Sequence, residues 1–82
     1  MNFNKHVRIR EEKFGTVIFE TLREKVFVTN GTGADIVRLI QKEKLPEEIV
    51  NELAAVYKAD ATLIAEDVKT FIDQLKHHQV LV

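Results

Sequence analysis

The chain has 82 residues, of which 45% are hydrophobic and 30% charged, and its formal net charge is -1. Residues 1–82 are enough for one small domain, and the nearly balanced charge argues against broad electrostatic binding to nucleic acid, which requires a concentrated basic surface. The absence of cysteine excludes disulfides, thiolate chemistry and cysteine-based metal sites.

The first 29 residues are typical of β-strands. Residues 6–11 (HVRIRE) alternate between apolar and charged side chains, which predicts a half-buried strand. Residues 14–22 (FGTVIFETL) predict a second strand, in which Gly15 marks a bulge or a close backbone approach. The LREK segment at 22–25 predicts a hairpin turn, and KVFVT at 25–29 predicts a third strand, antiparallel to the second.

The third strand is apolar on both faces and is followed directly by a helical pattern. A strand of this kind is either buried on both sides or completed by something outside the chain. Composition and spacing alone leave these two alternatives open.

Residues 32–80 are typical of helices. A proline suits the first turn of a helix, so Pro46 predicts the start of the second helix. The third helix is expected from about residue 63 to 78, and the closing VLV segment at 80–82 is expected to pack back onto the domain. Apolar residues recur at helical spacing in three groups: Ile36, Leu39 and Ile40; Ile49, Leu53, Val56 and Tyr57; Ile64, Val68, Phe71, Ile72 and Leu75.

The ends of the first and third helices carry candidate capping residues. Asn30 or Thr32 is expected to cap the first helix, and Asp60 or Thr62 the third, because these side chains accept hydrogen bonds from free amides. A glycine in the 31–33 segment is expected to adopt a positive φ.

The order of the predicted elements is β-β-β-α-α-α, which defines an α+β fold. Three short strands cannot bury an apolar face alone, so the antiparallel sheet must lie against the three helices. Two short helices and a longer third one after a hairpin sheet resemble a winged helix-turn-helix.

No constellation of catalytic or metal-binding residues stands out. His77 and His78 are adjacent on a helix and point in different directions, and serine is absent altogether. The NGTGAD segment at 30–35 lacks the remaining glycine and the Lys-Ser/Thr pair of phosphate-binding loops. We therefore expect no enzymatic activity, no bound metal and no cofactor.

Membrane and secretory signals are also missing. No apolar run reaches the roughly 20 residues of a membrane span, and the N-terminal segment lacks the apolar centre of a signal peptide. We expect a cytoplasmic protein without a membrane partner.

Three segments together resemble the PqqD-like proteins, also described as RiPP recognition elements. They are VFVTNGTGADIVRLI, IVNELAAVYKAD and EDVKTFIDQLKHHQVLV, which are similar to the family in order and spacing over nearly the whole chain. The upstream RIREEKFGTVIFET resembles members that accompany radical SAM maturases. One departure is the QKEKLP linker, where many members carry Asp-Gly between the first two helices.

The resemblance implies a small winged-helix peptide chaperone. Such a protein binds the leader segment of a ribosomally made precursor peptide and presents it to a modifying enzyme, often a radical SAM enzyme, as in PQQ biosynthesis. The leader would add as an antiparallel strand to the third strand, with its side chains in the groove beside the third helix. The implied peptide-binding residues are Val26, Phe27, Val28, Thr29, Asp67, Lys69, Thr70, Phe71, Gln74 and His78.

Alternatives remain for single residues and for the whole chain. Phe71 also fits plain core packing, and Lys69 also fits a solvated surface. A DNA-binding winged helix is the main rival function, although the third helix carries acidic residues beside Lys69 and Lys76. A structural domain of a larger assembly is a third reading, and the chain is expected to be a monomer or a domain-swapped dimer.

Overall fold

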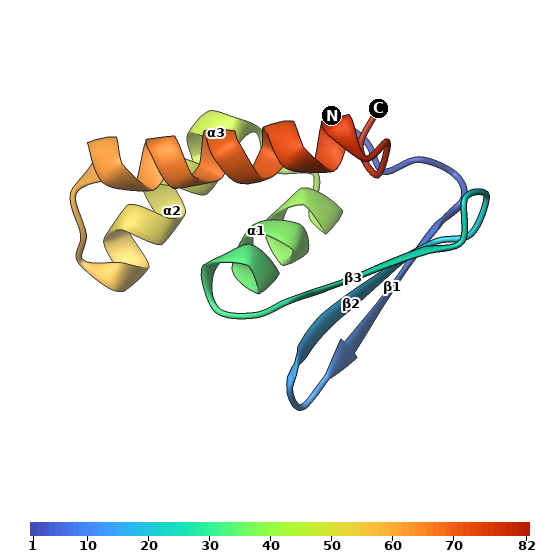
Figure 1. Ribbon diagram of the computed structural model, residues 1–82. Helices are drawn as coiled ribbons and strands as arrows, with labels where there is room; N and C mark the ends of the chain where they lie inside the picture. Colours follow the sequence, from blue (N-terminus) through green and yellow to red (C-terminus); the bar gives the residue numbers. More distant parts are fainter.

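The computed structural model describes all 82 residues, in one sheet and three helices. The order and type of the elements confirm the α+β prediction. Figure 1 shows the helices gathered on one side of the sheet, with the β1–β2 turn projecting away from them. The elements are β1 (Val7–Glu12), β2 (Gly15–Glu20), β3 (Lys25–Thr29), α1 (Thr32–Gln41), α2 (Pro46–Tyr57) and α3 (Ala61–His77).

The sheet is antiparallel with the strand order β1-β2-β3, so β3 hydrogen-bonds to a neighbour along one edge only. Across β2 and β3, Val17 lies opposite Val28, Ile18 opposite Phe27, and Phe19 opposite Val26. Because side chains alternate along a strand, Ile18 and Phe27 share the face turned to the helices, and the other two pairs share the outer face.

The turn between β2 and β3 occupies residues 21–24, one residue earlier than predicted. It is organised by Glu20, whose fully buried carboxylate accepts hydrogen bonds from the backbone N–H of Arg23 (2.8 Å) and from its guanidinium (3.3 Å). Glu24 takes a positive φ of 56° in the same turn. A side-chain acceptor therefore sets this hairpin, which lacks the glycine or asparagine of the commonest two-residue turns.

Both predicted roles of the glycines are found, at different positions. Gly15 has a φ of +148° and lies against the carbonyl oxygen of Thr29, which is the expected close backbone approach. Gly31 has a φ of 55° and occupies the N-cap of α1. The prediction that Asn30 or Thr32 caps α1 was wrong, since the helix begins without a side-chain cap. The reason is that the left-handed turn places a residue without a side chain at the capping position.

The third helix begins at Ala61, two residues before the predicted start. Asp60 caps it, as one of the two predicted alternatives, by accepting a hydrogen bond from the backbone N–H of Thr62 (2.7 Å). At its other end the chain folds back, because Val80 is fully buried and donates its N–H to the Leu75 carbonyl at 2.8 Å. Val80 and Leu81 thus pack back onto the domain as predicted for the VLV segment, whereas Val82 is 73% exposed.

The two ends of the chain lie together beside the C-terminal end of α3 (Figure 1). The backbone N–H of Asn4 donates to Val80 at 2.8 Å, and that of Val82 donates to Asn2 at 2.9 Å. Phe3 and Leu81 form an isolated antiparallel bridge. This short pairing ties the segment before β1 to the segment after α3.

The core consists of 14 buried apolar residues from the sheet, the three helices and the closing segment. Ile36, Ile49 and Val68 are among its most deeply buried members. The predicted apolar stripe of α2 was wrong at its C-terminal end, because Val56 is 65% exposed and Tyr57 is 38% exposed. None of the three helices has the length and apolar character needed to span a bilayer.

Tyr57 instead forms a polar link between α2 and α1. Its hydroxyl donates a hydrogen bond to the carboxylate of Asp35, which also pairs with the Arg38 guanidinium at 2.8 Å. Partial burial and the hydrogen bond to Asp35 raise the pKa of the Tyr57 hydroxyl above its ordinary value of about 10. The neutral phenol is therefore the form that the folded chain favours.

This link predicts a specific alkaline titration. Tyr57 is the single tyrosine and there is no tryptophan, so absorbance of the phenolate near 295 nm reports on it alone. We expect a midpoint above that of the unfolded chain in denaturant. The folded-state pKa is the higher one, so the stabilisation is complete below about pH 10 and is lost as pH rises through the folded-state pKa.

The Tyr57→Phe variant should lose this pH-dependent part of its free energy of unfolding while retaining the fold. Denaturant unfolding of both proteins across the alkaline range tests it. Equal midpoints for Tyr57 in the folded and unfolded chains would contradict the assignment.

Candidate functional site

A groove runs between the free edge of β3 and one face of α3. Its volume is about 290 Å³, and its walls are largely apolar. A strand edge with unpaired N–H and C=O groups forms one side, and helix side chains form the other. The lining residues are Ile18, Phe27, Val28, Thr29, Phe71, Gln74, Leu75 and His78.

Aromatic rings hold the two walls in position at one end of the groove. The ring of Phe27 packs on the core, and its centroid lies 5.0 Å from that of His78 in a tilted arrangement. His78 caps the C-terminal end of α3, where its backbone N–H donates to the Gln74 carbonyl at 3.0 Å. The middle of β3 and the end of α3 therefore meet here.

The other end of the groove rests on a close approach at Gly33. A side chain at this position would collide with the Oγ1 atom of Thr29 and approach the ring of Phe71 to 3.0 Å. Gly33 thus leaves space for Phe71, which is half-buried and packs against the core while also lining the groove. Both interpretations offered for Phe71, core packing and groove lining, describe its position.

The predicted binding residues divide into two sets in the structure. Six of them line the groove together: Phe27, Val28, Thr29, Phe71, Gln74 and His78. Val26 lies on the outer face of the same strand and is 59% exposed. Asp67 is exposed and lies one turn before Phe71 on the same helical stripe, but it is not among the residues that line the groove. Thr70 is exposed beside that stripe and does not line the groove.

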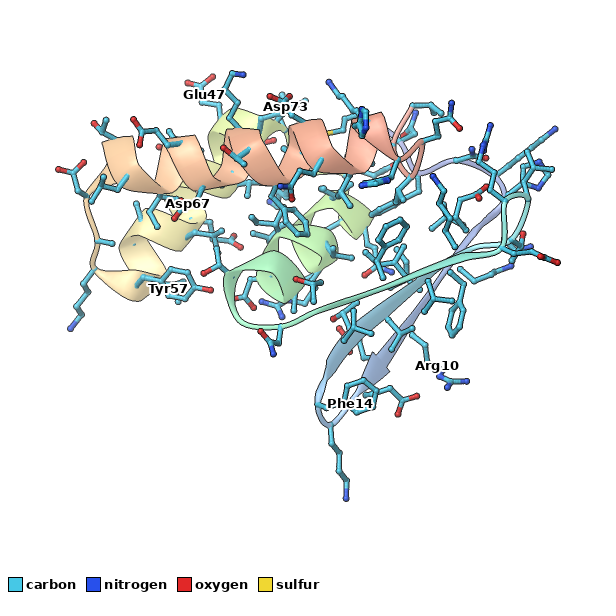
Figure 2. The ribbon with its side chains drawn as sticks, viewed as in Figure 1. Arg10, Phe14, Glu47, Tyr57, Asp67 and Asp73 are labelled. Atoms are coloured by element: carbon cyan, nitrogen blue, oxygen red, sulfur yellow. The ribbon has the colours of Figure 1, made fainter.

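Lys69 lies on a different face of α3. Its ammonium pairs with the carboxylate of Asp73 at 2.9 Å, and both side chains border a shallow depression between α2 and α3. Figure 2 shows Asp73 and Glu47 on one side of α3 and Asp67 on the opposite side. Lys69 therefore faces away from the groove, and this geometry agrees with its alternative interpretation as a solvated surface residue.

Two lining residues were not among the predicted site residues. Leu75 was assigned to the core only, and Ile18 was placed only in the second strand. The signal for Ile18 is the hairpin register, which puts it directly opposite Phe27 on the face turned to the helices. A four-residue turn without the usual glycine or asparagine left that register undetermined from sequence.

Chemically, this arrangement suits an extended polypeptide. The strand edge offers backbone hydrogen bonds to any chain laid beside it, and the apolar groove accepts every second side chain. The polar side-chain groups that line the groove are the Gln74 amide, the His78 imidazole and the Thr29 hydroxyl.

Comparison with known proteins points to a family of peptide-binding proteins. Residues 15–81 match the family described as coenzyme PQQ synthesis protein D (PqqD). Over 81 residues, the chain is 28% identical to a PqqA binding protein from Gluconobacter oxydans (strain 621H), covering 99% of this chain and 84% of that protein.

Two solved structures share the fold. TbiB1, in complex with the TbiA(beta) leader peptide, superposes with a TM-score of 0.94 at 25% identity, over 99% of this chain and 94% of that one. A lasso peptide synthetase B1, complexed with its leader peptide, superposes with a TM-score of 0.92 at 17% identity, over 99% and 95% of the two chains.

Fold and groove therefore define a small domain of the RiPP recognition element class, which is peptide-binding and non-catalytic. The chain belongs to the PqqD family, because the family match covers most of its length. The resemblance seen in the sequence is confirmed.

The close packing at Gly33 predicts that Gly33→Ala will disturb the groove. Overpacking costs roughly 1–3 kcal/mol, which exceeds the about 1 kcal/mol that alanine contributes to a helix. We expect reduced stability in denaturant unfolding and changed NMR shifts for Phe71 and Thr29.

Gly31→Ala is the matched control. A side chain there meets nothing within 4 Å, so only the positive φ opposes it, at a cost of about 1–2 kcal/mol. It should lower stability while leaving the Phe71 ring shifts unchanged. If both variants shift Phe71 equally, Gly33 has no special role in shaping the groove.

Proposed function

We propose that this chain binds the leader segment of a ribosomally made precursor peptide and presents it to a modifying enzyme of the radical SAM class. The leader adds to the free edge of β3 as an antiparallel strand, and alternate side chains enter the groove beside α3. The observation that carries the proposal is the juxtaposition of an unpaired strand edge with an apolar groove of about 290 Å³.

The comparisons support a leader peptide as the ligand. The relative from Gluconobacter oxydans is described as binding PqqA, and the TbiB1 structure contains a leader peptide. Family membership extends the same class of ligand to this chain. The radical SAM partner rests on the sequence resemblance of residues 8–21 to members that accompany such enzymes.

The charge pattern of α3 weighs against a DNA-binding winged helix. Reading duplex DNA requires a basic surface on the recognition helix. The exposed face of α3 carries Glu66, Asp67 and Asp73 as well as Lys69 and Lys76, and Lys69 is neutralised by its pair with Asp73. Duplex DNA should therefore cause no shifts in the ¹⁵N-HSQC spectrum even at low salt.

The direct test is a ¹⁵N-HSQC titration with the leader of a precursor peptide encoded beside the gene for this chain. Shifts should concentrate at residues 25–29 and on the stripe of α3 formed by Asp67, Phe71, Gln74 and His78. Residues around Lys69 and Asp73 should not move. A leader that shifts nothing, with or without the neighbouring maturase, would refute the proposal.

Substitution of Phe71 provides a quantitative prediction. Burying a phenylalanine side chain against a ligand contributes about 1.5–3 kcal/mol, so Phe71→Ala should weaken leader binding at least tenfold. Lys69→Ala is the control on the same helix, since its side chain faces away from the groove. Isothermal titration of the three proteins with one leader peptide measures the difference, and equal affinities would remove the groove from the mechanism.

Presentation to the enzyme is tested separately. Conversion of the full precursor by the maturase should require this chain, and excess isolated leader should inhibit it by competition. Conversion at an unchanged rate without the chain would limit its role to binding.

A further inference from the structure

The outward-facing positions of β3 are apolar, whereas edge strands commonly carry charged residues at such positions. By strand alternation Val26 and Val28 share the outer face of the sheet, and they are 59% and 58% exposed; Val28 also borders the groove at the strand edge. Natural edge strands commonly carry lysine or other charges at such positions, since these discourage unwanted strand pairing. On the opposite edge of the same face, β1 follows this pattern with Arg8 and Arg10; Figure 2 shows Arg10 projecting from the sheet.

On this face, two rows of side chains run across neighbouring strands and end at β3, where no further strand continues them. In one row Val17 lies between Arg10 and Val28, and only 6% of Val17 is exposed. In the other, Phe19 lies next to Val26 and carries the Arg10 guanidinium 5.8 Å from its ring centre. Each apolar side chain on β2 is thus flanked on both sides, whereas those on β3 are flanked on one side only.

We propose that a guest leader strand completes both rows, so that this chain reads the peptide on both faces of the added strand. The inference rests on the proposed strand addition and names the kind of sequence that it selects. That sequence has three consecutive apolar residues followed by an acidic residue.

The order of these residues follows from antiparallel geometry. Residues directly opposite each other in an antiparallel pair point to the same face. Guest residues opposite Val28 and Val26 therefore lie on the outer face, and the residue between them, opposite Phe27, enters the groove. Because the guest runs against β3, its chain meets Val28 first, then Phe27, then Val26 and finally Lys25.

Lys25 supplies the acidic preference at the last position. By strand alternation it shares the helix-facing side of the sheet with Phe27; it lies at the β2–β3 turn outside the groove lining, is half-buried and forms no ion pair within the chain. Its cross-strand neighbour Glu20 is already hydrogen-bonded to Arg23. A carboxylate on the guest strand opposite Lys25 would complete a charge pair on the groove side of the sheet.

A variant of the outer face tests the apolar part. The double substitution Val26→Thr and Val28→Thr keeps β-branched residues that suit a strand, and replaces one methyl group in each apolar contact with a hydroxyl. Binding of the leader peptide that titrates the wild-type protein should weaken about three- to tenfold, since cross-strand pairs are worth modest amounts each. Val56→Thr, at a 65% exposed position on α2, is the matched control and should leave affinity unchanged.

The position of Lys25 is tested by charge exchange. Lys25→Glu should weaken binding of the wild-type leader, and one leader variant with a single acidic residue replaced by lysine should restore it. That residue should directly follow three apolar ones.

The outcomes separate this inference from the strand addition on which it rests. The inference is overturned if a leader binds wild type and the threonine double variant equally and no charge exchange restores binding to Lys25→Glu. Binding of the leader in the groove would still stand. A leader that binds neither protein overturns both. HSQC spectra of the free variants establish that the sheet is intact in each case.

Discussion

β3 must remain folded while one of its edges stays unpaired, and this constraint governs the rest of the molecule. An open strand edge is normally a hazard, because it offers hydrogen bonds to any other chain. Here the edge is only five residues long and α3 lies beside it, so access is restricted to a segment narrow enough to enter the groove. The helix therefore protects the edge from indiscriminate pairing and still leaves it available to an extended peptide.

The groove stays open because its two walls rest on each other at fixed points. The ring of Phe27 contacts that of His78 at one end, and the absence of a side chain at Gly33 admits Phe71 at the other. Between these points Leu75 belongs to the core, so the floor is part of the folded unit. The binding surface is thus largely formed before any ligand arrives, which lowers the entropic cost of association. The small 14-residue core has two functions, holding the domain together and setting the width of the groove.

Much of this architecture could be predicted from the sequence. Alternation in the first strand, the β-branched second strand and the helical spacing of the apolar residues gave all six elements in the correct order. Predictions failed where tertiary geometry overrides local pattern. The stripe of α2 suggested that Val56 is buried, whereas its side chain is 65% exposed. Lys69 was grouped with the groove stripe, although its ion pair with Asp73 places it on the α2 side of α3. The contribution of Ile18 depends on the hairpin register, which the buried carboxylate of Glu20 organises and no turn motif signals.

The proposed recognition through a strand edge would also explain how the fold persists while the sequence diverges. Main-chain groups supply the generic part of such an interaction, and they are present in any sequence that forms the strand. The fold therefore constrains only the periodic apolar positions and the few close approaches, such as Gly33. This is consistent with TM-scores of 0.94 and 0.92 at 25% and 17% identity. Selectivity must then reside in the side chains around the edge, because the backbone cannot distinguish one peptide from another. In the recognition proposed for this chain those side chains lie on both faces of β3, which would account for a strand that is apolar on both faces.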